Sequence, residues 1–250
     1  MSGRATVKKK VIVYVKGMLI INLIWYAIHL IFNTRIIPDP LRVYGSFYLF
    51  VQEGMLWHIG SSLWRIFAGV LIALLLGSFL GYKMAVSNTW NKILNPLVFF
   101  TYPVPKTALL PIIMTIFGLG GASKIILIAM IIIFQIIISV RDSVAGIDRE
   151  CIYNIRSMGA SQVQILYHVV IPYIIPSILT SLRVTIGSAL SILFFCEAYG
   201  TSWGMGYYIL DAWTRIDYIS MYKGIIVLSS VGITLFFVID ILEQKIIKWR

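Results

Sequence analysis

The sequence is short of charge. Only 12% of its 250 residues are charged and only 10 are acidic, whereas 59% are apolar. A water-soluble domain would carry about 25% charged residues. Ten-residue segments of alternating polar and apolar residues, which mark membrane barrels, are also missing. We therefore expect an all-α, polytopic membrane protein, because a helix satisfies its own backbone hydrogen bonds in lipid.

Groups that carry chemistry are scarce as well. The two cysteines, Cys151 and Cys196, are expected on different sides of the membrane, so we expect no intrachain disulfide. The three histidines are scattered, and we expect no metal site. The sequence has no paired carboxylates, no activated nucleophile and no Gly-x-x-x-x-Gly-Lys-Ser/Thr phosphate loop. We therefore expect this chain to be neither an enzyme nor a cofactor carrier.

What the sequence does contain is a series of long apolar runs. A helix needs about 20 residues to cross the hydrocarbon core, and we expect about six such spans. They cover residues 11–32, 58–84, 97–117, 123–140, 173–197 and 223–242. The first run is too long for a signal peptide and is interpreted as a retained anchor after a tail of about residues 1–10. Residues 1–250 are expected to form one domain.

Basic residues indicate the orientation of these spans. Lys and Arg accumulate in short loops on the cytoplasmic side. Here they gather before the first span, near the second and fourth loops, and after the sixth span. We therefore expect a multi-pass protein of the cell membrane, plasma or inner, with both termini cytoplasmic. This distribution explains the net charge of +11, and no basic-aromatic patch predicts a nucleic-acid partner.

The cytoplasmic segment of about residues 141–172 carries the most local information. Asp148 is a good N-cap for a short helix, and Gly159 is suited to the left-handed conformation that ends one. The apolar face of this helix is expected to consist of Ile152, Ile155 and Met158. The segment therefore begins with a short amphipathic helix.

A second helix should follow, because Ser161 and Gln164 match a capping box. It is expected to stop before Pro172, which has no N–H to donate. Its apolar side is expected to comprise Val163, Leu166, Val169 and Val170. Two interpretations of this hairpin stay open: it rests on lipid headgroups, or it seats in a groove of a cytoplasmic motor subunit and transmits movement.

The hairpin resembles the cytoplasmic loop of the inner-membrane permeases of binding-protein-dependent ABC importers. Gly159 and Pro172 match the family's Gly and Ile-x-Pro anchors, and residues 156–161 are similar to its Arg-Ser-Leu-Gly-Ala-Ser. The family's Glu-Ala-Ala triplet is replaced by Tyr153-Asn154-Ile155, with Glu150 one turn earlier. The resemblance implies that an ATPase subunit contacts Glu150, Tyr153, Asn154, Arg156, Ser157, Gly159, Ala160, Ser161 and Pro172.

Further segments resemble the nitrate, sulfonate and taurine branch of that family. They are residues 62–69, 102–111, 117–120, 197–200 and 204–207. The resemblance implies a type I importer permease that pairs with an identical or homologous permease. It also implies two cytoplasmic ATPase subunits that hold ATP and Mg, and an extracytoplasmic binding protein. The solute would be a small anion of the sulfonate, taurine or nitrate kind, or alternatively a vitamin precursor.

Several residues are candidates for the substrate path. Pro103 and Pro105 free backbone carbonyls, which at membrane depth must be satisfied inside protein or a wet cavity. The ammonium of Lys106 faces substrate or water, pairs with a carboxylate such as Glu197, or snorkels to an interface. Arg65 is likewise a candidate either for substrate contact or for a position near a span end.

Glu197 ends the fifth span just before three glycines that allow a tight turn. It either gates the outer mouth of the path or bonds to nearby backbone amides. Arg183 has the same ambiguity as Arg65, and Asp240 is expected to be paired or near the inner interface. A secondary transporter with an ion relay through Lys106, Glu197 and Asp240 is the less favoured alternative, since no inverted repeat is evident.

Overall fold

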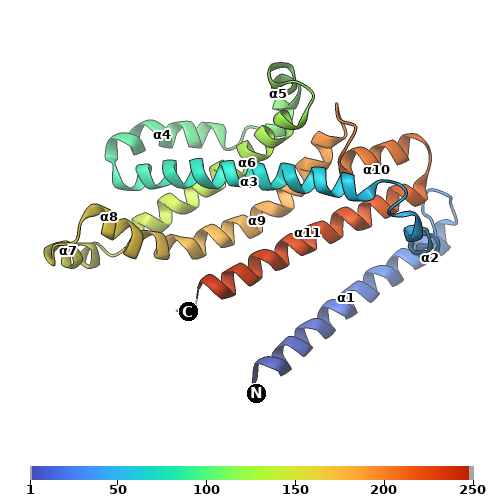
Figure 1. Cartoon of the computed structure of the whole chain (residues 1–250), viewed down its shortest axis with the longest axis horizontal. Helices are drawn as coiled ribbons and strands as arrows, with labels where there is room; N and C mark the ends of the chain where they lie inside the picture. Colours follow the sequence, from blue (N-terminus) through green and yellow to red (C-terminus); the bar gives the residue numbers. More distant parts are fainter. Residues whose placement is uncertain (1, 248–250) are drawn as a thin grey trace. The chain divides into compact units, whose positions relative to one another are not determined.

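The computed structural model describes the backbone of residues 2–247 and the side chains of residues 16–247 (Figure 1). Every regular element in this part of the chain is a helix, in agreement with the all-α prediction. The side chains of the expected basic tail, residues 1–10, and those of Lys248 and Arg250 lie outside the described set.

The helices form two compact units, and each is described by itself. The first comprises residues up to Leu56 together with Tyr208–Val227, and the second comprises Trp57–Tyr207 together with residues from Leu228 onward. The expectation of a single domain stays a prediction. The first unit contains α1 (Ser2–Phe32), α2 (Pro40–Gly45), η1 (Ser46–Leu49), most of α10 (Met205–Thr214) and the start of α11 (Tyr218–Ile246).

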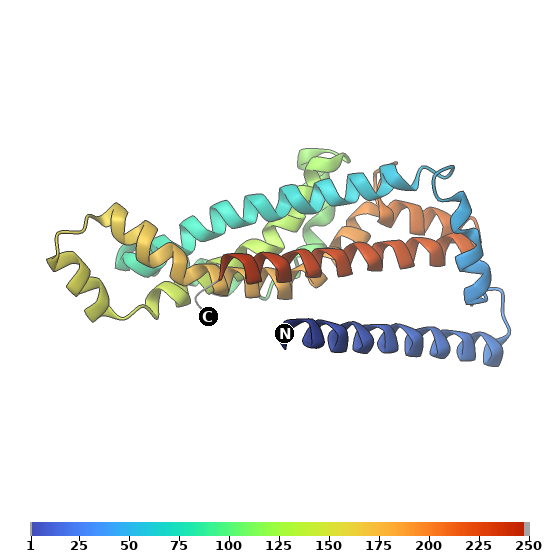
Figure 2. The ribbon, with the colours of Figure 1, turned by 60° about the horizontal axis from the view of Figure 1, so that its bottom comes forward.

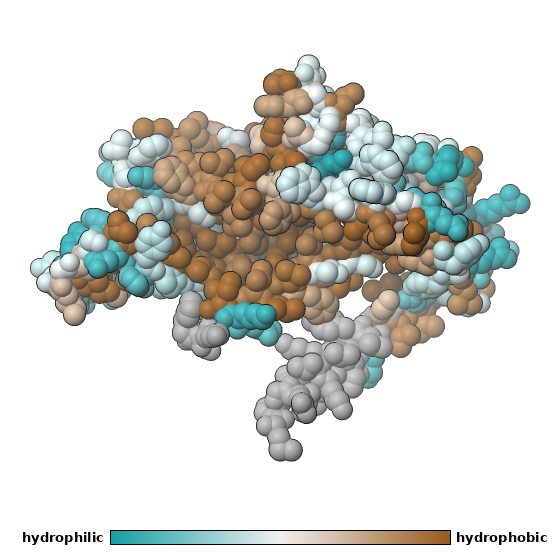
Figure 3. Space-filling view, viewed as in Figure 1, coloured by the Kyte–Doolittle hydropathy of each residue, from teal (hydrophilic) through white to brown (hydrophobic). Residues whose placement is uncertain are grey.

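The second unit holds the remaining helices. They are α3 (Met55–Val86), α4 (Asn88–Thr101), η2 (Lys106–Leu109), α5 (Leu110–Phe117), α6 (Gly121–Ala145), α7 (Arg149–Ser157), α8 (Gln162–Ile165), η3 (Leu166–Val170) and α9 (Ile171–Glu197). The later part of α11 also belongs here. Figure 3 shows apolar side chains covering much of the middle of this unit, as a lipid-facing surface requires.

Among the residues with described side chains, four helices are long and apolar enough to cross a membrane. They are α3, α6, the continuous helix Gln162–Glu197 and α11. A fifth span results if α4 and the η2–α5 segment are counted together, although they meet at an angle of 89°. The side chains of α1 are described only from Lys16 onward, and that part, Lys16–Phe32, is apolar. The six spans expected from the sequence are therefore an approximate count.

The expected third span, residues 97–117, is broken rather than continuous. α4 ends at Thr101, and the chain turns before η2 begins at Lys106. Pro103 and Pro105 cause the break, because neither has an N–H to donate and each disfavours a helical conformation in the residue before it. The sequence thus identifies the cause of the interruption but not the bend that results.

The second helix of the cytoplasmic hairpin does not stop before Pro172, contrary to the prediction. α8 continues through η3, a turn of π-helix, into α9. The N–H of Ile171 donates to the carbonyl of Leu166, five residues earlier. Pro172 then occupies the first turn of α9, where its missing N–H is tolerated. The widened turn lets one helix pass through the proline.

The core of the second unit lies mainly between α6 and α9. α3 approaches α6 along a face of glycine and alanine residues. A Cβ atom on Gly69 would lie 2.7 Å from Cγ2 of Ile128, and one on Gly81 would lie 2.6 Å from the carbonyl oxygen of Ile137. Ala73, fully buried, lies between them on the same face. Small residues four or eight positions apart allow this close packing.

In the first unit, a buried ion pair secures the segment after η1. The ammonium of Lys223, 1% exposed, donates to both carboxylate oxygens of Glu53 at 2.6 Å. The Tyr208 hydroxyl also donates to Glu53, at 2.6 Å. Burial and this carboxylate raise the pKa of the Tyr208 phenol. The indole of Trp25 stacks on Tyr222 at 5.2 Å between ring centroids.

Candidate functional site

The hairpin of α7 and α8 projects beyond the ends of α6 and α9 (Figure 2). Both of its helices are capped as predicted. Asp148 accepts a hydrogen bond of 2.9 Å from the N–H of Glu150 at the start of α7. Ser161 and Gln164 form a reciprocal capping box at the start of α8. The backbone donors at both helix starts are therefore partly satisfied within the hairpin.

The turn between the two helices depends on a left-handed glycine, which confirms the predicted conformation of Gly159. This residue has a φ of +87°, and its N–H donates to the carbonyl of Arg156 at 3.0 Å. The N–H of Ala160 donates to the carbonyl of Ile155 at 3.3 Å. This pair of bonds is the Schellman ending of a helix.

Two residues of the predicted apolar faces, Met158 and Val163, do not pack against the core of this chain. Ile152 and Ile155 pack against the core, but Met158 is 86% exposed because it follows the last turn of α7. Val163 is 61% exposed, whereas Ile165 is buried. Residues two positions apart in a helix point in directions about 200° apart around its axis. Because the side that faces the core is centred near Ile165, Val163 lies on the opposite side.

The side chains that the resemblance assigns to coupling are mostly exposed. All are exposed except Ala160 and Pro172, which are half-buried. Tyr153 exposes 73% of its surface, in a position where the family has a carboxylate. The hydroxyl of Ser157 donates a hydrogen bond of 2.8 Å to the carbonyl of Asn154. The larger exposed apolar side chains form what we call the hairpin surface, made of Tyr153, Met158, Val163 and Tyr167.

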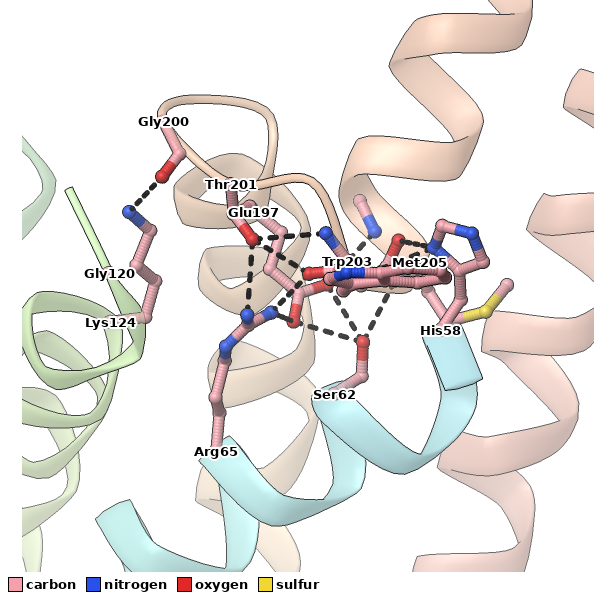
Figure 4. A network of polar contacts seen from close by, with 12 residues as sticks. His58, Ser62, Arg65, Gly120, Lys124, Glu197, Gly200, Thr201, Trp203 and Met205 are labelled. Atoms are coloured by element: carbon pink, nitrogen blue, oxygen red, sulfur yellow. Dashed lines mark hydrogen bonds and ion pairs between the residues drawn. The ribbon is translucent and has the colours of Figure 1, made fainter. Parts of the chain in front are cut away.

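A second candidate site, a network of polar side chains, lies where α9 ends, and Figure 4 shows its contacts. The carboxylate of Glu197 is fully buried. It accepts hydrogen bonds from the guanidinium of Arg65 at 2.5 Å, the hydroxyl of Ser62 at 2.8 Å and the N–H of Gly206 at 3.0 Å. Of the two expectations for Glu197, bonding to a nearby backbone amide is therefore observed, together with an ion pair.

Arg65 ties the turn after α9 to α3. Besides Glu197, its guanidinium donates to the carbonyl of Trp203 at 2.8 Å and to the hydroxyl of Thr201 at 3.1 Å. Arg65 is 7% exposed, so these contacts surround most of it. Gly204, with a φ of +139°, lies so close that a Cβ atom there would overlap the Glu197 carboxylate. Arg65 and Glu197 are thus brought together, and their predicted roles in the path stay predictions.

Two members of this network were not identified from the sequence. Ser62, fully buried, accepts from the N–H of Met205 at 2.8 Å, and Nδ1 of His58 lies 3.1 Å from the N–H of Gly204. The available signal was the spacing of His58, Ser62 and Arg65, which places three polar side chains on one face of an apolar helix. A polar stripe on a membrane helix needs a polar partner.

Lys106 does not pair with Glu197, which was one of the expectations for it. Its ammonium donates to the carbonyl of Tyr102. It also lies 5.3 Å from the ring centroid of Tyr102 and 5.1 Å from that of Phe134. The exposed Pro103 and Pro105 precede it. The break in span three therefore stabilises the lysine by a freed carbonyl and two aromatic faces.

An open cavity of about 880 Å³ lies beside η2, α5 and the end of α9. Its lining includes three residues with hydroxyl groups, Thr107, Thr115 and Tyr199, as well as Leu119 and Gly200. None of its lining residues is charged. A cavity of this size and character is suited to a small organic solute.

Near the middle of α9, Arg183 donates to Asp240 and, at 2.6 Å, to Glu243 of α11. Asp240 is therefore paired, as expected. In the described part of the chain, no group of three His, Cys, Asp or Glu side chains is placed to hold a metal ion.

These helices, with long apolar spans and a capped hairpin projecting beyond them, define a polytopic membrane component that carries no visible reaction centre in its described residues. Residues 69–248 match the family of binding-protein-dependent transport system inner membrane components. The match covers more than half of the chain, and the chain therefore belongs to this family of multi-pass inner-membrane permeases.

Several relatives named as transport permeases share most of its length. The taurine transport system permease protein TauC of Escherichia coli (strain K12) is 31% identical over 200 residues, which is 80% of this chain and 73% of TauC. A protein named as an aliphatic sulfonates transport permease, SsuC of Bacillus subtilis (strain 168), is 29% identical over 95% of this chain and 88% of its own. The formylaminopyrimidine transport permease protein ThiX of Halalkalibacterium halodurans is 26% identical over 93% of both chains.

The fold is also that of a solved importer. A chain of the inward-facing MetNI methionine ABC transporter superposes with a TM-score of 0.65 at 18% identity, covering 78% of this chain and 96% of the other. At that identity the likeness establishes the fold alone, an ABC importer permease fold. The remaining part of this chain has no counterpart in that superposition.

Proposed function

We propose that this chain is one of two permease subunits of an ATP-driven importer for a small anionic solute of the sulfonate kind. The proposal is supported by family membership and by relatives named for taurine and aliphatic sulfonates. The single observation that carries it furthest is the projecting hairpin, whose exposed apolar side chains suit a protein groove. The second permease is an identical copy or a homologue, and an extracytoplasmic binding protein delivers the solute.

The hairpin surface is the proposed contact with the two cytoplasmic ATPase subunits, which would bind ATP and Mg. Three of its side chains are largely exposed: Tyr153 at 73%, Met158 at 86% and Val163 at 61%. A cluster of exposed apolar side chains is typical of a protein interaction site. The capped turn at Gly159 holds both helices rigidly enough to transmit a push. Both termini are placed in the cytoplasm together with the hairpin, in line with the positive-inside distribution.

Movement of the hairpin reaches the path through α9. Because α8, η3 and α9 form one continuous helix, a displacement at Ser161 is carried along the helix toward Glu197. The cavity beside α5 and the end of α9 is the proposed outer part of the path; Lys106 and the break at Pro103 and Pro105 come just before its first lining residue, Thr107, in the sequence. The buried pair of Arg65 and Glu197 keeps the outer turn in place while the two permeases rock.

A vitamin precursor is the second candidate solute. It is favoured by one observation, the similarity to ThiX over 93% of both chains. Uptake of labelled aliphatic sulfonates and of a formylaminopyrimidine, each with the chain's own binding protein, separates the two candidates.

The proposed function is tested by purifying the tagged chain from its native cell in mild detergent and determining the assembly by native mass spectrometry. We expect two permeases with two ATPase subunits, and the masses will show whether the permeases are identical. Recovery of the chain without any nucleotide-binding partner, under conditions that preserve other such complexes, would overturn the proposal.

A further inference from the structure

The deepest charge in the second unit that lacks a carboxylate partner is Lys124, near the start of α6. Its side chain is fully buried. The ammonium donates to the carbonyl of Leu119 at 2.5 Å. It also donates to the carbonyl of Gly200 at 3.4 Å (Figure 4). Burying an ammonium is costly, and two carbonyl dipoles compensate only part of that cost. A buried charge held in this way calls for a functional explanation.

The nearby carboxylate does not neutralise this lysine. Glu197 is already paired with Arg65 at 2.5 Å and accepts from Ser62 and from the N–H of Gly206. Arg65, Lys124 and Glu197 together carry a net charge of one positive unit, from two cations and one anion. The excess charge therefore belongs to Lys124.

The excess charge lies directly behind the wall of the open cavity. Both carbonyls that hold the ammonium come from residues that line that cavity, Leu119 and Gly200. The lining itself has hydroxyl groups and apolar side chains but no charge. A solute in the cavity thus meets a positive field without a direct ion pair.

We infer that Lys124 is a specificity-determining residue that makes this cavity selective for anionic solutes. The inference rests on the proposed function and names the residue that selects for its anionic class of solute. A cation that is separated from the cavity by one peptide group attracts an anion without binding it tightly. Weak binding suits a transport path, because the path must also release its solute. Sulfonate and carboxylate groups fit this field, and ammonium groups are repelled by it.

The test measures the field in the cavity without using transport. Thr115→Cys places a thiol on the cavity lining, in a chain with Cys151→Ser; the remaining Cys196 is fully buried. The chain, purified from its native cell with whatever partners it retains, is treated with two thiosulfonate reagents, a negatively charged sulfonatoethyl and a positively charged trimethylammonioethyl compound. The reaction rate of the negatively charged reagent is divided by that of the positively charged one. This ratio, divided by the same ratio for a small free thiol, reports the local electrostatic potential.

We expect the normalised ratio to exceed one and to fall about tenfold in Lys124→Met, since removing one nearby unit charge changes the local concentration of a monovalent ion by that order. Lys124→Arg keeps the charge and should keep the ratio. Lys83→Met is the matched control, because it removes the same charge from α3 away from the cavity lining.

A ratio that stays within twofold in Lys124→Met overturns the inference, and so does a loss in Lys124→Arg equal to that in Lys124→Met. If Lys124→Met does not accumulate, the parental ratio decides: a value above one supports the inference, and a value at or below one overturns it. None of these outcomes depends on an ATPase partner, so failure here is distinguishable from failure of the proposed function.

Discussion

Gly159 is the single residue on which the shape of the hairpin most depends. Its φ of +87° is strained for any residue with a Cβ atom, and most of all for a β-branched one. No other atom lies within 4 Å of the position a Cβ would take, so the effect of a substitution comes from the backbone alone.

We therefore expect Gly159→Val to cost about 2 kcal/mol locally and to uncouple transport while membrane insertion is retained. Solute uptake and solute-stimulated ATP hydrolysis by the purified complex measure the effect. Gly159→Asn should be milder, because Asn tolerates the left-handed region. Gly17→Val is the control, since a Cβ at Gly17 also meets open space but on an ordinary helix. Normal uptake by Gly159→Val at normal expression would contradict the coupling role.

The buried pair of Arg65 and Glu197 is the second feature decided by single residues. Arg65→Met leaves the Glu197 carboxylate buried with only neutral donors, and we expect a loss of about 3–5 kcal/mol of stability. The free energy of unfolding in detergent measures it. Arg65→Met combined with Glu197→Leu should recover part of the loss, because the uncompensated charge is gone.

Arg215→Met provides the contrast for this prediction. Arg215 pairs with Asp211 at 2.8 Å, but its side chain is 58% exposed. Solvent screens such a pair, and its removal should cost less than about 1 kcal/mol. Equal losses in Arg65→Met and Arg215→Met would show that burial of the first pair has no energetic consequence.

Among the elements, α3 packs closely against α6 through a face of small residues. Gly69, Ala73, Gly77 and Gly81 follow one another at intervals of four residues, and α6 fills the space beside them. The nearest obstacle to a Cβ on Gly81 is the backbone oxygen of Ile137, which cannot rotate away.

We expect Gly81→Ala to destabilise the protein by about 1–3 kcal/mol through overpacking. Gly60→Ala on the same helix should be neutral or stabilising by about 0.5–1 kcal/mol, because it meets open space and improves helix propensity. Thermal unfolding of both variants in the same detergent makes the comparison. A Gly81→Ala protein as stable as Gly60→Ala would contradict close packing of α3 on α6.

At the scale of the whole molecule, the exposed Cys151 on α7 reports assembly and orientation without any engineering. If the hairpin docks on an ATPase subunit, a membrane-impermeant maleimide should label Cys151 in the isolated chain and label it at least about fivefold more slowly in the complex. In intact cells the same reagent should not label it, because we propose that the hairpin lies in the cytoplasm.

Cys196 serves as the internal control, since it is fully buried and should stay unlabelled in every preparation. Labelling of Cys151 from outside intact cells would reverse the proposed orientation. Unchanged labelling on assembly would leave the hairpin without its partner and would contradict the docking proposal.

Local patterns in the sequence were sufficient wherever the determining contacts lie within a few residues. The cap at Asp148, the left-handed Gly159 and the capping box at Ser161 involve partners at most five residues apart, and all are present. The same reasoning was wrong at Pro172, because the chain widens one turn and continues as a helix. It also left open which apolar residues of the hairpin pack against the core, because the exposure of Val163 depends on the direction from which the core approaches.

The sequence by itself determined that this protein is helical, lies in a membrane and carries a capped hairpin, because apolar run length and capping are local properties. Only the tertiary structure decided that Arg65 pairs with Glu197, 132 positions away, and that Lys106 turns instead to Tyr102 and two aromatic rings. It alone placed the charge of Lys124 behind a neutral cavity. Charges in a membrane interior take whichever partner the packing of distant helices brings within reach, and spacing along the chain does not record that choice.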